Sequence, residues 1–109
     1  MDSEMKARLA SNQASLRTVN EGVRGELAGG MVGFRCECGR LGCTRIVMLS
    51  RDEYEAVRAH PRRFAVVPAH DVAEIEKVVV RHASHAVVEV RAELATLAER
   101  TDPRRASAE

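Results

Sequence analysis

Three cysteines lie within eight residues of this chain, in the pattern C-x-C-x4-C, and the sequence contains no fourth cysteine. An odd number of cysteines, in a chain with no recognisable secretory signal, argues against a disulfide framework. Residues i and i+2 of a strand or tight turn point the same way, so Cys36 and Cys38 can face one point. Gly39 and Gly42 permit the left-handed turn that returns Cys43 to that point. Three converging thiolates suit a soft or borderline dication, above all Zn²⁺.

A closed zinc site needs a fourth ligand, and histidine is the usual donor. His60 lies at the end of an expected helix, where an imidazolium ion is stabilised by the helix dipole. His82 and His85 flank an expected hairpin turn, where we expect both to be solvated. His70 follows an expected strand and Pro68, in a loop that a strand beside the cysteine turn can present to the thiolates. The predicted metal ligands are Cys36, Cys38, Cys43 and His70. Three ordinary buried thiols, or a redox-active thiol pair, are the alternatives.

Apolar residues recur at helical spacing between residues 4 and 28, which predicts a long N-terminal helix stopped by Gly29 and Gly30. From Met31 the period changes to the alternation of a half-buried strand. Ser50 opens a short helix, because Glu53 three residues later completes a capping box. The segment 72–91 fits either a helix or a hairpin, and its β-branched runs favour the hairpin. The other expected elements are strands at 31–36, 44–49 and 64–67 and a closing helix at 92–100.

At 109 residues and 12.0 kDa, the chain has room for one small α+β unit. We expect an N-terminal helix at 1–30, a zinc-binding α+β domain at 31–101 and a mobile C-terminal tail at 102–109. The domain is expected to hold a small antiparallel sheet with a zinc-binding turn and short packing helices. A chain this small buries only about two thirds of its unfolded surface, so a bound metal would help it fold.

The composition excludes some classes of function. The formal net charge of +1 predicts no strong attraction to nucleic acid or anionic lipid. No apolar run approaches the roughly 20 residues that a membrane helix needs. The first residues carry acid and no apolar segment, so we expect a cytoplasmic protein without a signal peptide.

Four protein ligands would leave no open position on the metal, which is how structural zinc sites differ from catalytic ones. We therefore expect a non-catalytic module that acts through protein–protein interaction, with a partner or a second copy bound through the apolar stripe of the N-terminal helix. No catalytic residue is predicted. Glu37 is the nearest candidate general base, but a residue between two ligands usually points away from them.

Two other functions fit the pattern. Residues 35–63 hold seven arginines against four acids, which suits a nucleic-acid-binding regulator or equally an acidic protein partner. The candidate partner-binding residues are Arg35, Arg40, Arg45, Arg62 and Arg63. The second alternative is a redox or zinc sensor, in which oxidation of the thiolates releases the metal.

With these residues in place, the chain resembles a family of small, largely uncharacterised Cys3His zinc-binding-like proteins from high-GC, actinobacterial-type bacteria. The matching segments are 17–21, 34–38 with Cys43, 49–58, 61–66, 67–70 and 102–104. The resemblance implies that the three cysteines and His70 belong to one recurring metal-binding pattern. It implies no established activity. The family usually has a glycine where this chain has Ala69, so the departure concerns the backbone conformation of residue 69 more than the ligand His70.

Overall fold

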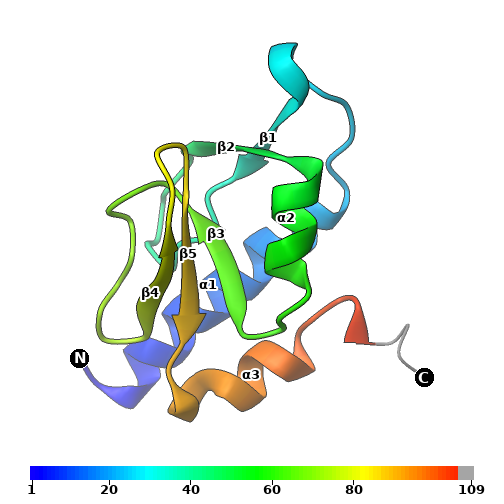
Figure 1. The fold of residues 1–109 in the computed structure, drawn as a ribbon. Helices are drawn as coiled ribbons and strands as arrows, with labels where there is room; N and C mark the ends of the chain where they lie inside the picture. Colours follow the sequence, from blue (N-terminus) through cyan, green and yellow to red (C-terminus); the bar gives the residue numbers. More distant parts are fainter. Residues whose placement is uncertain (106–109) are drawn as a thin grey trace.

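The computed structural model describes residues 1–105 and confirms the α+β class (Figure 1). In chain order the elements are α1 (Ser3–Glu21), the short 3-10 turn η1 (Ala28–Gly30), β1 (Met31–Arg35), β2 (Ile46–Ser50), α2 (Arg51–Arg58), β3 (Arg63–Val66), β4 (Glu76–Arg81), β5 (Ala86–Val90), η2 (Ala92–Leu94) and α3 (Ala95–Arg100). None of the helices within these residues combines the length and the apolar character needed to cross a membrane.

Helix α1 is shorter than the sequence predicted. Its N-terminus is capped by Asp2, whose carboxylate accepts the N–H of Met5 at 2.8 Å. It ends at Glu21 and not at residue 28, because the backbone turns at Gly22 and adopts a φ of 87° at Gly25. The expectation of a helix across residues 22–28 was therefore wrong, and these residues form an excursion that leads to η1.

The buried face of α1 also differs from the predicted apolar stripe. Of that stripe, Leu9 is buried, but Met5, Val19 and Leu27 are 36%, 53% and 58% exposed. The buried face includes three polar side chains, which the core can accept because each finds hydrogen-bond partners there. They are Gln13, Arg17 and Asn20.

The strands form two antiparallel sheets, where one was expected. One is the β1–β2 hairpin, with Gly33 opposite Met48. The other has the strand order β3–β5–β4, which confirms the hairpin reading of residues 72–91. Glu37, just beyond β1, donates its N–H to the carbonyl of Ala65 in β3 at 2.9 Å and so links the two sheets.

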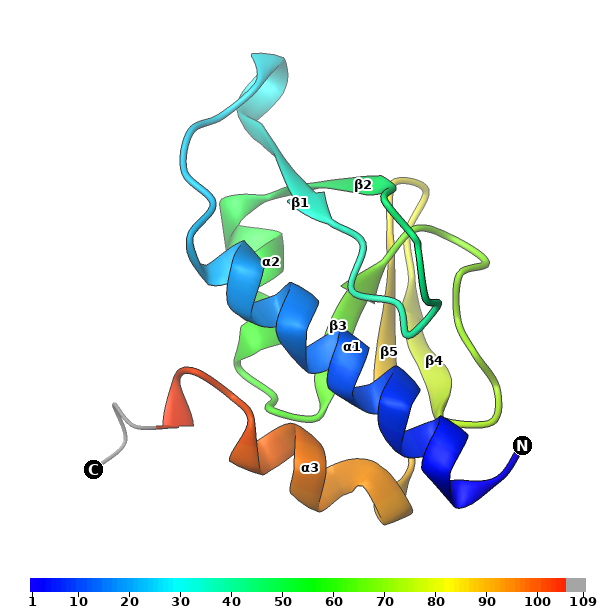
Figure 2. The same cartoon turned by 180° about the vertical axis from the view of Figure 1, so that it is seen from behind.

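The core has two parts. One contains Leu9 of α1, the buried cysteines and the apolar side of α3 around Ala98. The other lies between β1–β2, α2 and the three-stranded sheet, where Phe34 and Tyr54 stack with ring centroids 4.1 Å apart. Seen from behind, α1 lies across the strands and α3 lies beside their lower end (Figure 2).

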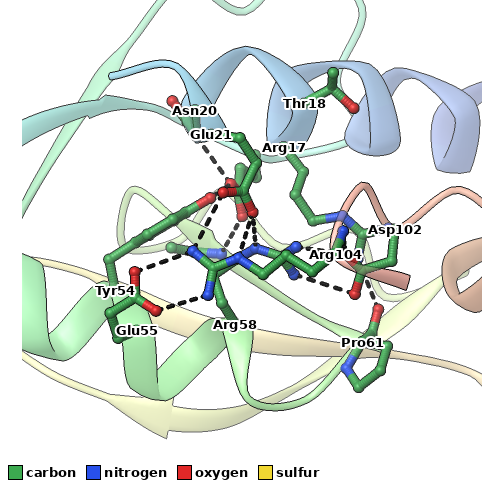
Figure 3. A network of polar contacts seen from close by, with 12 residues as sticks. Arg17, Thr18, Asn20, Glu21, Tyr54, Glu55, Arg58, Pro61, Asp102 and Arg104 are labelled. Carbon is green, nitrogen blue, oxygen red and sulfur yellow. Dashed lines mark hydrogen bonds and ion pairs between the residues drawn. The ribbon is translucent and has the colours of Figure 1, made fainter. Parts of the chain in front are cut away.

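The first residues of the expected mobile tail are fixed by ion pairs (Figure 3). Asp102 is 8% exposed and pairs with the buried guanidinium of Arg58 at 2.5 Å. Arg104 pairs with Glu21 of α1 at 2.7 Å and with Glu55 of α2 at 2.6 Å. The expectation of a tail from residue 102 is therefore corrected for 102–105. The rest of that tail, 106–109, lies outside the described residues.

Candidate metal centre

The three cysteines lie on the connection between β1 and β2. Cys36 continues β1, because its N–H donates to the carbonyl of Arg45 at 2.9 Å. The turn then needs glycine at two points. A Cβ on Gly39 would lie 3.0 Å from atoms of both Ile75 and Leu9, and Gly42 has a φ of 82°. The chain is thereby turned back so that Cys43 approaches the other two thiols.

His70 comes from the loop that follows β3. Its N–H donates to the carbonyl of Val67 at 2.9 Å, which closes a tight turn. Within this turn Ala69 has a φ of 70°, and no other non-glycine residue described has a positive φ. Arg40 in the cysteine turn reaches across to the carbonyls of His70 and Asp71, at 3.4 and 3.3 Å, and so ties the two loops together.

The ligand atoms of Cys36, Cys38, Cys43 and His70 all lie within 4.8 Å of one another. Nδ1 of His70 is 3.6 Å from Sγ of Cys36 and 3.7 Å from Sγ of Cys43. Tetrahedral zinc with Zn–S of about 2.3 Å and Zn–N of about 2.0–2.1 Å would place its nitrogen and sulfur ligands about 3.5 Å apart. The four side chains can therefore hold one metal ion. Within residues 1–105, no other group of three or more His, Cys, Asp or Glu side chains has this proximity.

The thiols of Cys36 and Cys38 are buried and lie close together in the site. The neighbouring Cys38 thiol lowers the pKa of Cys36, helped by the N–H of Val67, which donates to its Sγ at 3.2 Å. The neighbouring Cys36 thiol and burial raise the pKa of Cys38. Metals bind the deprotonated thiolates, so a bound cation would take the place of the thiol protons. Desolvation and then the charges of Arg45 and Arg40 lower the pKa of His70, which favours the neutral imidazole that binds metals.

Glu37 points away from the thiols, as expected for a residue between two ligands. Its carboxylate accepts the N–H of Ala65 at 2.9 Å, Nδ2 of Asn20 at 2.9 Å and the hydroxyl of Tyr54 at 2.6 Å. Burial raises its pKa in spite of these hydrogen bonds. The carboxylate holds the strand between Cys36 and Cys38 in place from behind.

The supporting residues Asn20 and Tyr54 were missed in the sequence. A signal for Asn20 is present, because polar residues at 13, 17 and 20 repeat at the 4-and-3 spacing of a buried helix face. Tyr54 carries no such signal, since a tyrosine on a short helix is ordinary core material.

The other three histidines lie apart from the thiols. His60 and His82 are exposed. His85 was expected to be solvated, and this was wrong: it is 2% exposed, stacks on His82 and lies 3.1 Å from Oγ of Ser84 through its Nδ1. His85 lines a pocket with Glu53 and Val57 of α2 and with His60 just beyond that helix, so the hairpin turn lies against α2 and the ring of His85 is shielded from solvent.

The five arginines predicted to bind a partner lie in two places. Arg40 and Arg45 are exposed beside the cysteine turn, and Arg35 is half-buried at the end of β1. Arg62 and Arg63 lie at the start of β3, whereas the loop with His70 follows the other end of this strand, at Val66. At the usual rise per residue of a strand, Arg63 is about 10 Å from Val66. There they form ion pairs with Glu99 at 3.3 Å and with Glu89 at 3.1 Å.

No protein-family model matches this chain, and no curated protein and no solved structure shows significant similarity to it. Its function therefore has to be inferred from the residues and geometry of the site.

Proposed function

We propose that the protein is a small, non-catalytic zinc-binding module that acts by binding a protein partner, with Cys36, Cys38, Cys43 and His70 as a structural zinc site. The observation that carries this proposal is the convergence of three thiols and one imidazole nitrogen within 4.8 Å. Four protein ligands complete the tetrahedral shell of zinc and leave no position for substrate.

The donor set favours zinc over other metals. Three sulfur ligands and one imidazole suit a borderline-soft cation that prefers tetrahedral geometry. Magnesium and calcium prefer oxygen ligands, and iron–sulfur clusters usually take four cysteines. The chain contains three cysteines in all.

The surroundings of the site support a structural and not a catalytic role. Glu37, the nearest carboxylate in the sequence, uses both oxygens in hydrogen bonds on the far side of the strand. A metal here would join the β1–β2 connection to the loop after β3. Structural zinc sites contribute an apparent 10–16 kcal/mol or so, which is decisive for a domain of this size.

Native mass spectrometry of the full chain, expressed in zinc-supplemented medium, tests the metal. We expect one zinc per chain, reduced or lost in His70→Ala and in Cys43→Ser. The matched control is His60→Ala, which should keep the metal because His60 is exposed and lies apart from the thiols. Removal of the metal with a chelator should abolish the near-UV circular dichroism of the fold. A folded chain without metal, or zinc retained in both ligand variants, would overturn the proposal.

One observation favours a sensor as the second candidate. Cys43 and His70 are only half-buried, so an oxidant can reach this side of the site. Hydrogen peroxide would oxidise two thiolates to a disulfide, be reduced to water and leave too few ligands to hold zinc. Stoichiometric peroxide should then release the metal, as a zinc-sensitive dye would report. Retention of the metal under these conditions would remove this candidate and leave the structural site.

A further inference from the structure

We infer that the outer face and free edge of the β1–β2 hairpin bind an extended segment of a partner protein that combines apolar and acidic residues. This inference rests on the proposed function and adds to it the surface used and the class of partner.

The outer face of the hairpin carries a contiguous apolar patch. A Cβ built at Gly33 would lie 3.1 Å from Cγ2 of Ile46, 3.7 Å from Sδ of Met48 and 4.0 Å from Cδ1 of Leu27. Three apolar side chains therefore meet over a glycine, and Ile46 and Leu27 are 49% and 58% exposed. The inner face of the same hairpin is buried in the core, so this patch lies on its unpartnered side.

The same hairpin leaves the edge of β2 unpaired. The N–H of Cys36 donates to the carbonyl of Arg45, and in an antiparallel pair every second residue after Arg45 then hydrogen-bonds to β1. The residues in between, Ile46 and Met48, therefore direct their N–H and C=O groups away from β1. The N–H of Ser50 follows this alternation, since it turns outward to the carboxylate of Glu53 at 2.7 Å. No described residue forms a hydrogen bond with the outward groups of Ile46 or Met48. Such an edge is a template for an added strand.

The charge beside the patch favours an acidic partner. Arg35 lies on the outer face opposite Ile46, and Arg45 directly precedes Ile46. Among residues 1–105, neither arginine forms an ion pair with an acidic side chain. Acidic residues on an added strand would supply those partners, while its apolar residues would cover Ile46 and Met48.

The same charges disfavour a second copy of the chain. Strand β2 holds no acidic residue, so a second copy paired edge to edge would bring further arginines to this surface and no carboxylate from its own β2 to pair with them. Helix α1 offers a weaker surface. Its exposed Met5 and Val19 are 14 residues apart, or about 21 Å along the helix, and form no single patch.

Selection from a random 12-residue peptide library displayed on phage tests the inference, with the full zinc-loaded chain as the target. We expect enrichment of peptides that alternate apolar residues with Asp or Glu. One enriched peptide, synthesised with a fluorescent label, should bind the wild type in a fluorescence-anisotropy titration. Ile46→Lys, Arg35→Glu and Met48→Pro should each weaken that binding at least tenfold. The proline should preserve the β1–β2 ladder, because the N–H of Met48 faces outward.

The matched control is Val19→Lys, an equally exposed apolar residue on α1, which should bind the peptide as the wild type does. Any of several results would overturn the inference: no enriched peptide, enrichment of basic peptides, or full binding by the three β-hairpin variants. Tighter binding of a labelled DNA duplex than of any peptide, or self-association abolished by Ile46→Lys, would also overturn it. The zinc content of each protein is measured in parallel, so loss of peptide binding with one zinc per chain is distinguished from failure of the metal site itself.

Discussion

The side-chain amide of Asn20 pairs with the backbone of Arg35 as a neighbouring strand would. Oδ1 of Asn20 accepts the N–H of Arg35 at 2.8 Å, and Nδ2 donates to the carbonyl of Arg35 at 2.9 Å. The same Nδ2 also donates to Glu37 at 2.9 Å. The end of α1 is thereby fixed to the strand that carries the first metal ligand.

Replacement of Asn20 by alanine should therefore be costly. It would leave the backbone groups of Arg35 and part of the buried carboxylate of Glu37 without partners, and we expect a loss of about 2–4 kcal/mol in the free energy of unfolding. Urea denaturation measures this loss. Asn12→Ala is the control, since Asn12 makes a single, longer hydrogen bond at 3.4 Å to the carbonyl of Arg40. Equal stabilities of the two variants would contradict the role given to Asn20.

The turn before His70 should gain stability from glycine. Ala69 has a φ of 70°, a conformation that costs an L-residue about 1–2 kcal/mol and costs glycine almost nothing. Glycine also loses more conformational entropy on folding than alanine does, and this loss offsets part of the gain. The net effect of Ala69→Gly should be a rise of up to about 1 kcal/mol in the free energy of unfolding. Thermal denaturation measures the change against Ala73→Gly, at an exposed position without a positive φ, which should be neutral or destabilising. A destabilised Ala69→Gly variant would be inconsistent with this backbone.

Glu76 makes the stability of the fold depend on pH. Burial raises its pKa to about 7, although Val72 and Gln13 donate hydrogen bonds to its carboxylate at 2.8 and 2.5 Å. Between the unfolded value of 4.5 and about 7, the folded chain binds this proton and the unfolded chain does not. The contribution of Glu76 to the free energy of unfolding therefore falls as pH rises through this window.

Glutamine does not titrate, so Glu76→Gln should remove this pH dependence. From pH 4.5 to 7.5, the free energy of unfolding of the variant should rise by on the order of 2–3 kcal/mol relative to that of the wild type. Denaturant titrations at a series of pH values measure the difference between the two proteins, whatever constant offset the lost carboxylate oxygen introduces. The exposed Glu74→Gln should keep the wild-type slope. Parallel pH profiles for the wild type and Glu76→Gln would refute the prediction.

The ion pair between Arg58 and Asp102 should be strongly stabilising in its context (Figure 3). The side chain of Arg58 is 0% exposed and that of Asp102 is 5% exposed. Among the described residues, Asp102→Asn would leave the buried guanidinium with Glu21, at 2.8 Å, as its one acidic partner, and we expect a loss of about 2–4 kcal/mol in the free energy of unfolding. The control is Asp52→Asn, at an exposed position in the first turn of α2, which should lower the free energy of unfolding by about 0.5 kcal/mol. Chemical denaturation of both variants measures the two losses.

Local patterns in the sequence predicted the elements whose signals are short-range. The capping box of Ser50 and Glu53 starts α2 as expected, with Glu53 N–H donating to Oγ of Ser50 at 3.1 Å. The β-branched runs predicted the β4–β5 hairpin, and the cysteine spacing with His70 predicted which four side chains meet. Each of these depends on neighbouring residues or on the chemistry of one residue type.

Features that depend on distant partners could not be predicted in the same way. The burial of Arg17 becomes favourable only when its guanidinium can donate to the carbonyls of Pro61 and Ala98, both at 2.7 Å. The burial of His85 depends on the packing of α2 against a hairpin turn, and the position of Asp102 depends on Arg58, 44 residues earlier. The early end of α1 is different, because Gly22 and Gly25 signal it in the sequence.

X-ray absorption spectroscopy at the zinc edge of the purified, zinc-loaded chain tests the central claim most directly. The account predicts three sulfur neighbours at about 2.3 Å and one imidazole nitrogen at about 2.0–2.1 Å, with the nitrogen lost in His70→Ala. A first shell that contains oxygen, or fewer than three sulfurs, or a spectrum unchanged by His70→Ala, would contradict a site closed by Cys36, Cys38, Cys43 and His70.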